Sequence, residues 1–171
     1  SGKARFAGVG GVHMSSEGLE SLFPIDELSV LGLFELIPKI PKFLKRIGET
    51  VHDIFLKKPC AVITIDSKGF NFRIAKQIAL KQNNETKKIK LIHMVAPTVW
   101  AWRPGRAKKI AKLFDHLLAM FPFEPAYFIP HGLKTSFVGH PALEEKEGNA
   151  DTFKKSFSIP KDCLVLSLLP G

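Results

Sequence analysis

Short runs of apolar residues alternate along this chain with longer stretches in which apolar side chains recur every three or four positions. The short runs favour strands buried on both faces, and the longer stretches favour amphipathic helices. Such alternation is typical of a parallel sheet covered by helices, so we predict an α/β fold with a Rossmann-like parallel sheet and flanking helices. The predicted strands are residues 5–9, 60–65, 89–95, 116–120, 135–138 and 163–169.

The predicted helices fill the stretches between these runs. In the segment 31–58, Pro38 and Pro41 interrupt the pattern, and Pro41 suits the start of a helix because the first turn does not need its missing N–H. From there apolar residues recur at helical spacing, so we expect the helix proper to begin at Pro41. The remaining helices are predicted at residues 72–82, 104–114, 124–129 and 150–157.

Charge and composition narrow the class of protein. The formal net charge of +9, from 25 Lys and Arg against 16 Asp and Glu, favours an anionic partner: nucleic acid, acidic lipid or a phosphorylated substrate. A hydrophobic fraction of 45% is ordinary for a folded domain and excludes a disordered chain. We find no apolar run long enough to cross a membrane and no signal-peptide core, and we therefore expect a cytoplasmic protein.

The two cysteines, Cys60 and Cys163, each lie in an apolar run. This placement favours buried, reduced thiols. Neither their spacing nor that of the six histidines matches a zinc site, and we expect no bound metal.

Asp66 is the carboxylate that stands out. Ligands of open α/β sheets bind outside the carboxyl ends of the strands, and Asp66 directly follows the apolar run 60–65. A carboxylate partly withdrawn from water at this position can act as a general base. The alternative is an aspartate that caps the following turn through backbone N–H groups.

The loop 96–106 is unusual in composition. It contains both tryptophans of the chain, Trp100 and Trp102, beside Arg103 and Arg106. Arginines near the start of a helix can hold a phosphate together with exposed backbone N–H groups. The alternative is a pair of half-buried indoles that anchor the loop in front of a solvated basic helix.

Two further loops lie at predicted strand ends. Gly10 and Gly11 lack side chains and can let the backbone approach a ligand closely. His140 can orient a leaving group or simply cap the end of a strand. The sequence leaves both alternatives open.

The segment 32–45 mixes apolar and basic side chains between its prolines. This pattern suits the surface of an anionic bilayer, although a helix covering the core would also produce it. The residues expected to contact the membrane are Phe34, Ile37, Lys39, Ile40, Lys42 and Phe43.

Seven collinear segments, spread over residues 5–171, resemble the lipid-A-disaccharide synthase family. The loop WAWRPGR together with the step FPFEP is the most specific part. The segments are FAGVGGVHM (6–14), LFPIDELSVLGLFELIP (22–38), VITIDSKGFNFRIAK (62–76), VAPTVWAWRPGRAKKIAK (95–112), DHLLAMFPFEPAYF (115–128), GLKTSFVGHPALE (132–144) and LSLLPG (166–171).

The resemblance implies a glycosyltransferase of the GT-B type, with two Rossmann-like domains, of which this chain would be a truncated N-terminal half. It implies inverting transfer of diacylglucosamine from its UDP donor to diacylglucosamine 1-phosphate, which makes the β-1,6-linked lipid A precursor. It implies no metal or other cofactor, no nucleic acid partner, and a peripheral position on the inner face of the bacterial inner membrane.

The resemblance also suggests roles for individual residues. Asp66 matches the aspartate of the family motif I-D-[AS]-P-D-F, the expected general base, but Lys68-Gly69 replaces Pro-Asp. The expected acceptor and phosphate contacts are Gly10, Gly11, Trp102, Arg103, Arg106 and His140.

The resemblance divides the chain at residue 145. Residues 1–145 would form the acceptor-side domain without its first strand, and residues 146–171 would form a linker and the first strand of a UDP-binding domain. We expect such a piece alone to be inactive. The alternatives are a non-catalytic basic domain that binds anionic lipid or nucleic acid, and another UDP-sugar glycosyltransferase or epimerase.

Overall fold

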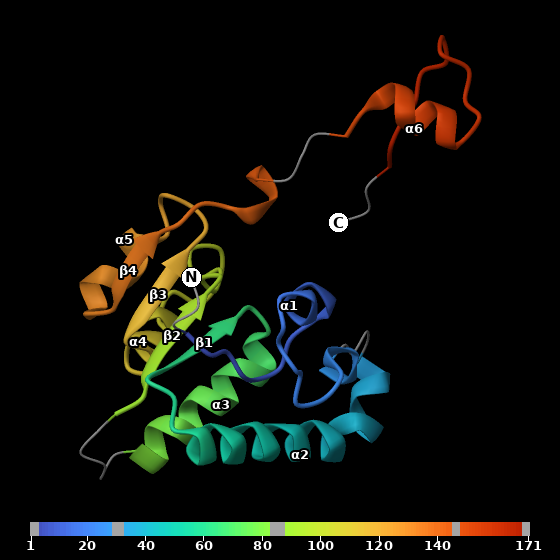
Figure 1. Cartoon of the computed structure of the whole chain (residues 1–171). Helices are drawn as coiled ribbons and strands as arrows, with labels where there is room; N and C mark the ends of the chain where they lie inside the picture. Colours follow the sequence, from blue (N-terminus) through green and yellow to red (C-terminus); the bar gives the residue numbers. More distant parts are fainter. Residues whose placement is uncertain (1–3, 29–32, 83–87, 145–147, 169–171) are drawn as a thin grey trace. The chain divides into compact units, whose positions relative to one another are not determined.

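The computed structural model describes residues 4–28, 33–82, 88–144 and 148–168, with side chains given from residue 40 onward in the first long helix (Figure 1). Residue contacts divide the chain into two compact units, residues 1–139 and residues 140–171. None of the helices in the described part of the chain combines the length and the apolar composition needed to span a membrane.

A parallel sheet of four strands forms the centre of the first unit. The strands are β1 (Ala61–Ile65), β2 (Lys90–Met94), β3 (His116–Ala119) and β4 (Lys134–Phe137), in the order β1-β2-β3-β4. All three pairings are parallel. The predicted α/β class and four of the predicted strands are therefore confirmed.

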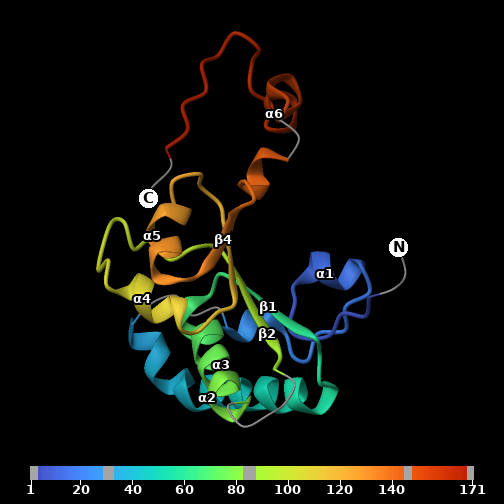
Figure 2. The ribbon, with the colours of Figure 1, turned by 90° about the vertical axis from the view of Figure 1, so that its left-hand side faces the viewer.

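Helices cover one face of this sheet. Helix α2 (Leu33–Lys57) precedes β1, and α3 (Lys68–Lys81), α4 (Arg106–Ala111) and α5 (Pro125–Phe128) connect the successive strands. Right-handed crossovers between adjacent parallel strands place α3, α4 and α5 on the same side. Helix α2 packs against α3 in this layer (Figure 2).

The core fills the space between this helical layer and the sheet. In α3 the apolar residues recur four apart, so that one face of the helix points inward. Burying such side chains contributes roughly 1.5–3 kcal/mol each. The main core residues are Ile47, Val51, Phe70, Ile74, Ile78, Leu91, Ile110, Phe114, Leu117 and Phe128, all less than a tenth exposed.

The remaining elements are short. They are α1 (Val12–Ser16), η1 (Ile25–Leu28), η3 (Ile129–His131) and η4 (Pro141–Leu143), together with α6 (Ala150–Ser156) in the second unit. Helix α6 confirms the prediction for residues 150–157.

Two of the predicted strands are wrong. In residues 5–9 a single bridge joins Gly8 to Ser21, and the φ of 147° at Gly8 interrupts an extended chain. Residues 163–168 form no strand, because within the second unit no described strand lies beside them to complete a ladder. Their side chains are exposed.

The predicted burial was wrong for both cysteines and for β1. Cys60 precedes the strand and Cys163 lies in the unpaired segment, so both are exposed. Strand β1 is an edge strand with helices on one face only, which leaves Ile63 and Ile65 56% and 44% exposed.

Two helix boundaries also differ from those predicted. Helix α2 runs through Pro38 and Pro41 instead of beginning at Pro41, because packing of Phe43, Ile47 and Val51 on the core stabilises the helix despite the hydrogen bonds that the prolines remove. Helix α3 begins at Lys68 instead of residue 72, because the chain turns from strand to helix within two residues.

Candidate functional site

Asp66 lies at the carboxyl edge of the sheet, directly after β1. Its N–H donates to the carbonyl oxygen of Met94 at 3.0 Å, which extends the pairing of β1 with β2 by one residue. Asp66 and Ser67 have φ angles of 45° and 40°, in the left-handed region. That conformation costs a non-glycine residue roughly 1–2 kcal/mol, so the surrounding structure must hold this turn in place.

Asn71, in the first turns of α3, supplies much of that hold. Its side-chain amide donates to the carbonyl oxygens of Ile65 and Asp66, both at 2.9 Å. The N–H of Asn71 donates to the carbonyl oxygen of Ser67, also at 2.9 Å. One side chain therefore fixes the last residue of the strand and the backbone of Asp66.

The carboxylate of Asp66 itself is left exposed. The predicted withdrawal from water is therefore not found, and β1, which Asp66 follows, is an edge strand. Within the described residues the Asp66 side chain makes no hydrogen bond, and Ser67 at the helix start makes no side-chain cap either. The alternative in which Asp66 caps its own turn is thus not found, and its oxygens face solvent.

A buried histidine lies on the strand beside this turn. His93 of β2 is 0% exposed; its Nδ1 lies 2.8 Å from Oγ1 of Thr64, and its ring packs on Phe72 and Phe114. Burial lowers the pKa of His93 to about 4, against a smaller opposite effect from the charge of Asp66. Its Nε2 has no hydrogen-bond partner among the described residues. The ring is therefore neutral, and no sequence spacing indicated its position.

The loop after β2 brings together three of the predicted residues. The guanidinium groups of Arg103 and Arg106 lie 4.3 Å and 5.0 Å from the ring centre of Trp102. Trp100 and Trp102 are 44% and 60% exposed, so each indole is about half-buried and the anchoring alternative stays open. The loop also presents two exposed cations beside the indole of Trp102.

The sequence prediction missed an aromatic cluster beside this loop. The ring of Trp100 meets that of Phe123 edge-on at 5.5 Å, and Phe121 stacks on Phe123 at 5.7 Å. Buried Glu124 fixes the turn after β3 by accepting the N–H groups of Met120 and Phe121, each at 3.0 Å. The signal was present in the segment FPFEP, which served only to establish the resemblance.

The predicted glycine pair lies beside α1. Gly10 is buried and donates its N–H to Oγ of Ser21 at 3.1 Å. A Cβ on Gly10 would lie 2.8 Å from Sδ of Met14 and would also overlap Leu19, whereas one on Gly11 would meet nothing closer than 3.9 Å. Gly10 therefore has a packing role, and contact of either glycine with a ligand stays a prediction.

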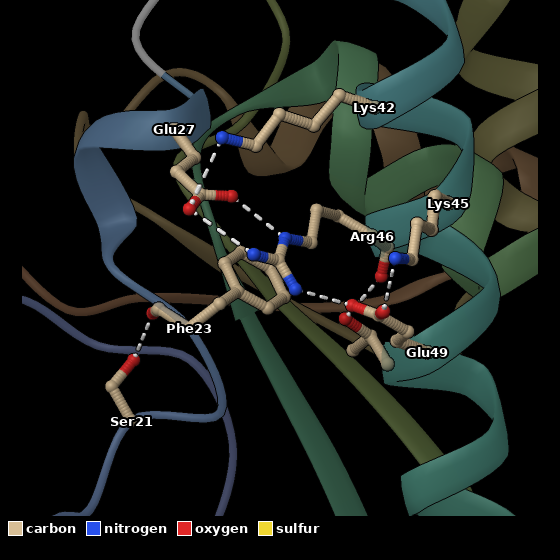
Figure 3. A network of polar contacts seen from close by, with 8 residues as sticks. Ser21, Phe23, Glu27, Lys42, Lys45, Arg46 and Glu49 are labelled. Atoms are coloured by element: carbon tan, nitrogen blue, oxygen red, sulfur yellow. Dashed lines mark hydrogen bonds and ion pairs between the residues drawn. The ribbon is translucent and has the colours of Figure 1, made fainter.

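A polar network joins this N-terminal segment to α2 (Figure 3). Arg46 donates to Glu27 at 2.7 Å and to Glu49 at 2.6 Å, and its guanidinium lies 4.7 Å from the ring centre of Phe23. Lys42 adds a second cation 3.3 Å from Glu27. The hydrogen bond from Arg46 holds the pKa of Glu27 below its usual value. The network fixes η1, and with it the glycine segment, to the helical layer.

The predicted membrane contacts have different surroundings. Phe43 packs on the core, with its ring 5.6 Å from that of Phe70, and Lys42 is paired with Glu27. Ile40 is 42% exposed. The side chains of Phe34, Ile37 and Lys39 lie outside the described residues. Membrane contact therefore stays a prediction.

His140 is the first residue of the second unit. Its Nδ1 accepts the N–H of Ala142 at 3.2 Å and so caps η4. This contact caps the start of a 3-10 helix and not the end of a strand, which ends at Phe137. A role for His140 in the site stays a prediction, as does the division of the chain at residue 145.

The carboxyl edge of the first unit thus carries an accessible carboxylate, two cations stacked on an indole and an exposed aromatic cluster. In the described ranges no three His, Cys, Asp or Glu side chains gather to hold a metal ion. The groups present suit proton removal, phosphate binding and contact with apolar or ring-shaped ligand parts.

The family model described as lipid-A-disaccharide synthetase matches residues 1–171. The chain is 46% identical to the lipid-A-disaccharide synthase of Rhodospirillum centenum over 99% of this chain and 42% of that protein. It is 48% identical to the one of Paramagnetospirillum magneticum, over 97% of this chain and 42% of that protein. It is 41% identical to the lipid-A-disaccharide synthase of Rickettsia bellii, over 98% of this chain and 43% of that protein. The chain spans less than half the length of these relatives.

Proposed function

This chain belongs to the lipid-A-disaccharide synthetase family, and from this membership we propose that it contributes the acceptor side of a glycosyltransferase. The proposed donor is UDP-diacylglucosamine and the proposed acceptor is diacylglucosamine 1-phosphate. Transfer makes a β-1,6-linked disaccharide with inversion at the anomeric carbon. The proposed location of the protein is the anionic inner face of the bacterial inner membrane.

Asp66 is the proposed general base. As the acceptor 6-hydroxyl oxygen attacks the anomeric carbon, its proton passes to the carboxylate of Asp66, and the bond to the UDP oxygen breaks with its electron pair leaving on UDP. The exposure of Asp66 supports this role, because a base must reach the acceptor hydroxyl. The hydrogen bonds from Asn71 support it too, because they hold the Asp66 backbone in one orientation.

Arg103 and Arg106 are proposed to hold the acceptor phosphate. Each guanidinium contacts Trp102 and makes no ion pair among the described residues. A guanidinium that lies over an aromatic ring keeps its N–H groups for a phosphate, which it can bind with two parallel hydrogen bonds. The contact of both guanidinium groups with Trp102 is the observation that supports the phosphate assignment.

The aromatic cluster of Trp100, Phe121 and Phe123 is proposed to contact acyl chains of the acceptor. These three rings are 43–45% exposed and lie against one another, and such a contiguous apolar patch is typical of a binding surface. Its rigid support by Glu124 favours a preformed contact.

The test of this function is disaccharide formation by the full-length protein. We expect Asp66→Asn and Asp66→Ala to lower kcat by about a hundredfold to ten-thousandfold, the usual contribution of a general base, with a much smaller change in KM. Asp26→Asn, at another exposed aspartate of the same unit, is the matched control and should leave kcat unchanged. A wild-type rate in Asp66→Ala would contradict the assignment.

A further inference from the structure

Helices α3 and α4 enclose an open groove of about 500 Å³ on the outer surface of the helical layer. Five of its seven lining residues are basic, and the other two, Phe72 and Leu113, give it an apolar floor. The basic residues are Lys68, Arg73 and Lys76 of α3, Lys109 of α4, and Lys112, which directly follows α4.

The sequence spacing explains why these side chains gather. Lys68, Phe72 and Lys76 recur every four residues, which places them in one row along α3. Lys109 lies three and four residues before Lys112 and Leu113, so these three also share a face. The row on α3 extends about 12 Å along the helix axis. The groove therefore consists of two facing rows of cations with apolar side chains between them.

The charge of the groove is not compensated within the protein. Among the described residues none of the five cations forms an ion pair, although Lys42, Arg46, Lys57 and Lys90 elsewhere do so. Arg73 donates to the carbonyl oxygen of Gly69. This hydrogen bond holds the guanidinium in position but does not neutralise its charge. Like charges three or four residues apart destabilise a helix, and a bound anion would remove that repulsion.

We propose that this groove is a binding site for clustered phosphate groups, either a free diphosphate or the phosphates of lipid head groups. Lysines act as point charges toward phosphate, and Arg73 can bind one with two hydrogen bonds. Phe72 and Leu113 suit the carbon groups that carry such phosphates. The proposal concerns binding alone, and it does not depend on Asp66 or on transfer.

The test uses the full-length protein and two probes. One probe is inorganic pyrophosphate, titrated by calorimetry. The other is vesicles of phosphatidylcholine, alone or with a third of the lipid replaced by phosphatidylglycerol. The groove variant is Lys76→Gln/Lys109→Gln, and its control is Lys108→Gln/Lys134→Gln, which removes the same charge from exposed positions outside the groove. The variant Lys76→Arg/Lys109→Arg keeps the charge.

We expect the groove variant to weaken binding of pyrophosphate or of anionic vesicles by more than tenfold, at about fivefold per lysine near a phosphate surface. The control should stay within about twofold, and the arginine variant should restore binding. A loss confined to pyrophosphate identifies a free diphosphate as the ligand, and a loss confined to vesicles identifies lipid head groups. Equal losses in groove and control variants, or no binding of either probe, would overturn the proposal.

Discussion

At the scale of single residues, Gly10 and Gly11 illustrate how neighbours in sequence can differ in role. A Cβ at Gly10 would overlap Met14 and Leu19, whereas the space beside Gly11 is open. We therefore expect Gly10→Ala to lower the free energy of unfolding by about 1–3 kcal/mol, the usual cost of overpacking. Gly11→Ala should change it much less, because its backbone angles suit any residue. Urea unfolding of both variants checks this, and equal effects would contradict it.

His93 gives a prediction of pH dependence. Because burial lowers its pKa from 6.5 to about 4, the unfolded chain binds a proton between these pH values and the folded chain does not. The contribution of His93 to the free energy of unfolding is therefore full above pH 6.5 and falls by about 1.4 kcal/mol per pH unit as the pH drops toward 4. Between pH 6.5 and pH 5, the loss of free energy of unfolding that is due to His93 is about 2 kcal/mol.

Denaturant unfolding at pH 7.5 and pH 5 can isolate this share. Between pH 7.5 and pH 5, the free energy of unfolding of His93→Leu should fall by about 2 kcal/mol less than that of the wild type. Glu27, whose pKa is lowered by the hydrogen bond from Arg46, contributes equally to both proteins and cancels. His131→Gln removes an imidazole from the surface and is the control. An unchanged pH dependence in His93→Leu would mean that the buried ring titrates normally.

The position of Asp66 could be predicted from the sequence, but its surroundings could not. An aspartate that follows an apolar strand lies at the carboxyl edge in any parallel sheet. Its exposure depends on β1 being an edge strand, and the burial of His93 depends on Phe72 and Phe114, which lie far from it in the sequence. Such non-local packing leaves no local pattern.

At the scale of elements, success depended on whether an element needs a distant partner. Strands β1 to β4 were predicted because each apolar run finds a neighbour in the same sheet. The runs 5–9 and 163–168 have similar composition, but without an adjacent described strand they do not form a ladder. The start of α3 was predicted four residues late, because two residues in left-handed conformations are not visible in a hydrophobic pattern.

The turn between β1 and α3 provides a prediction at this scale. Asn71→Ala removes both side-chain hydrogen bonds to the turn and should lower stability by about 1–3 kcal/mol. It should also lower kcat of the full-length protein, because the Asp66 backbone is no longer held. Asn149→Ala removes the cap of α6 and costs about 1 kcal/mol, but it should leave kcat unchanged. If both variants lower kcat to the same degree, Asn71 does not position Asp66.

At the scale of the whole molecule, the α/β class was predictable because it depends only on the alternation of strand and helix patterns. The charge balance predicted an anionic partner without indicating where it binds. Five of the basic residues line one groove, and they gather there because α3 and α4 both contribute to its lining. Composition determines the net charge, but only the tertiary structure determines where the charged side chains lie on the surface.

The net charge of +9 on these 171 residues and the apolar start of α2 together predict how this part of the protein binds anionic vesicles. Salt at about 1 M shortens the Debye length to about 3 Å, so the part of binding due to exposed lysines should be lost. The part due to Phe34, Ile37 and Ile40, predicted from the sequence to enter the bilayer, should persist, because apolar burial is not screened.

Cosedimentation with phosphatidylglycerol vesicles at low and high salt separates these two parts. Phe34→Ser/Ile37→Ser/Ile40→Ser should abolish the salt-resistant binding, a loss of more than tenfold from the area removed. The control is Leu56→Ser/Leu80→Ser, at exposed apolar positions of α2 and α3. If salt alone releases the wild type completely, association is purely electrostatic, and the groove between α3 and α4 is then the first surface that must account for it.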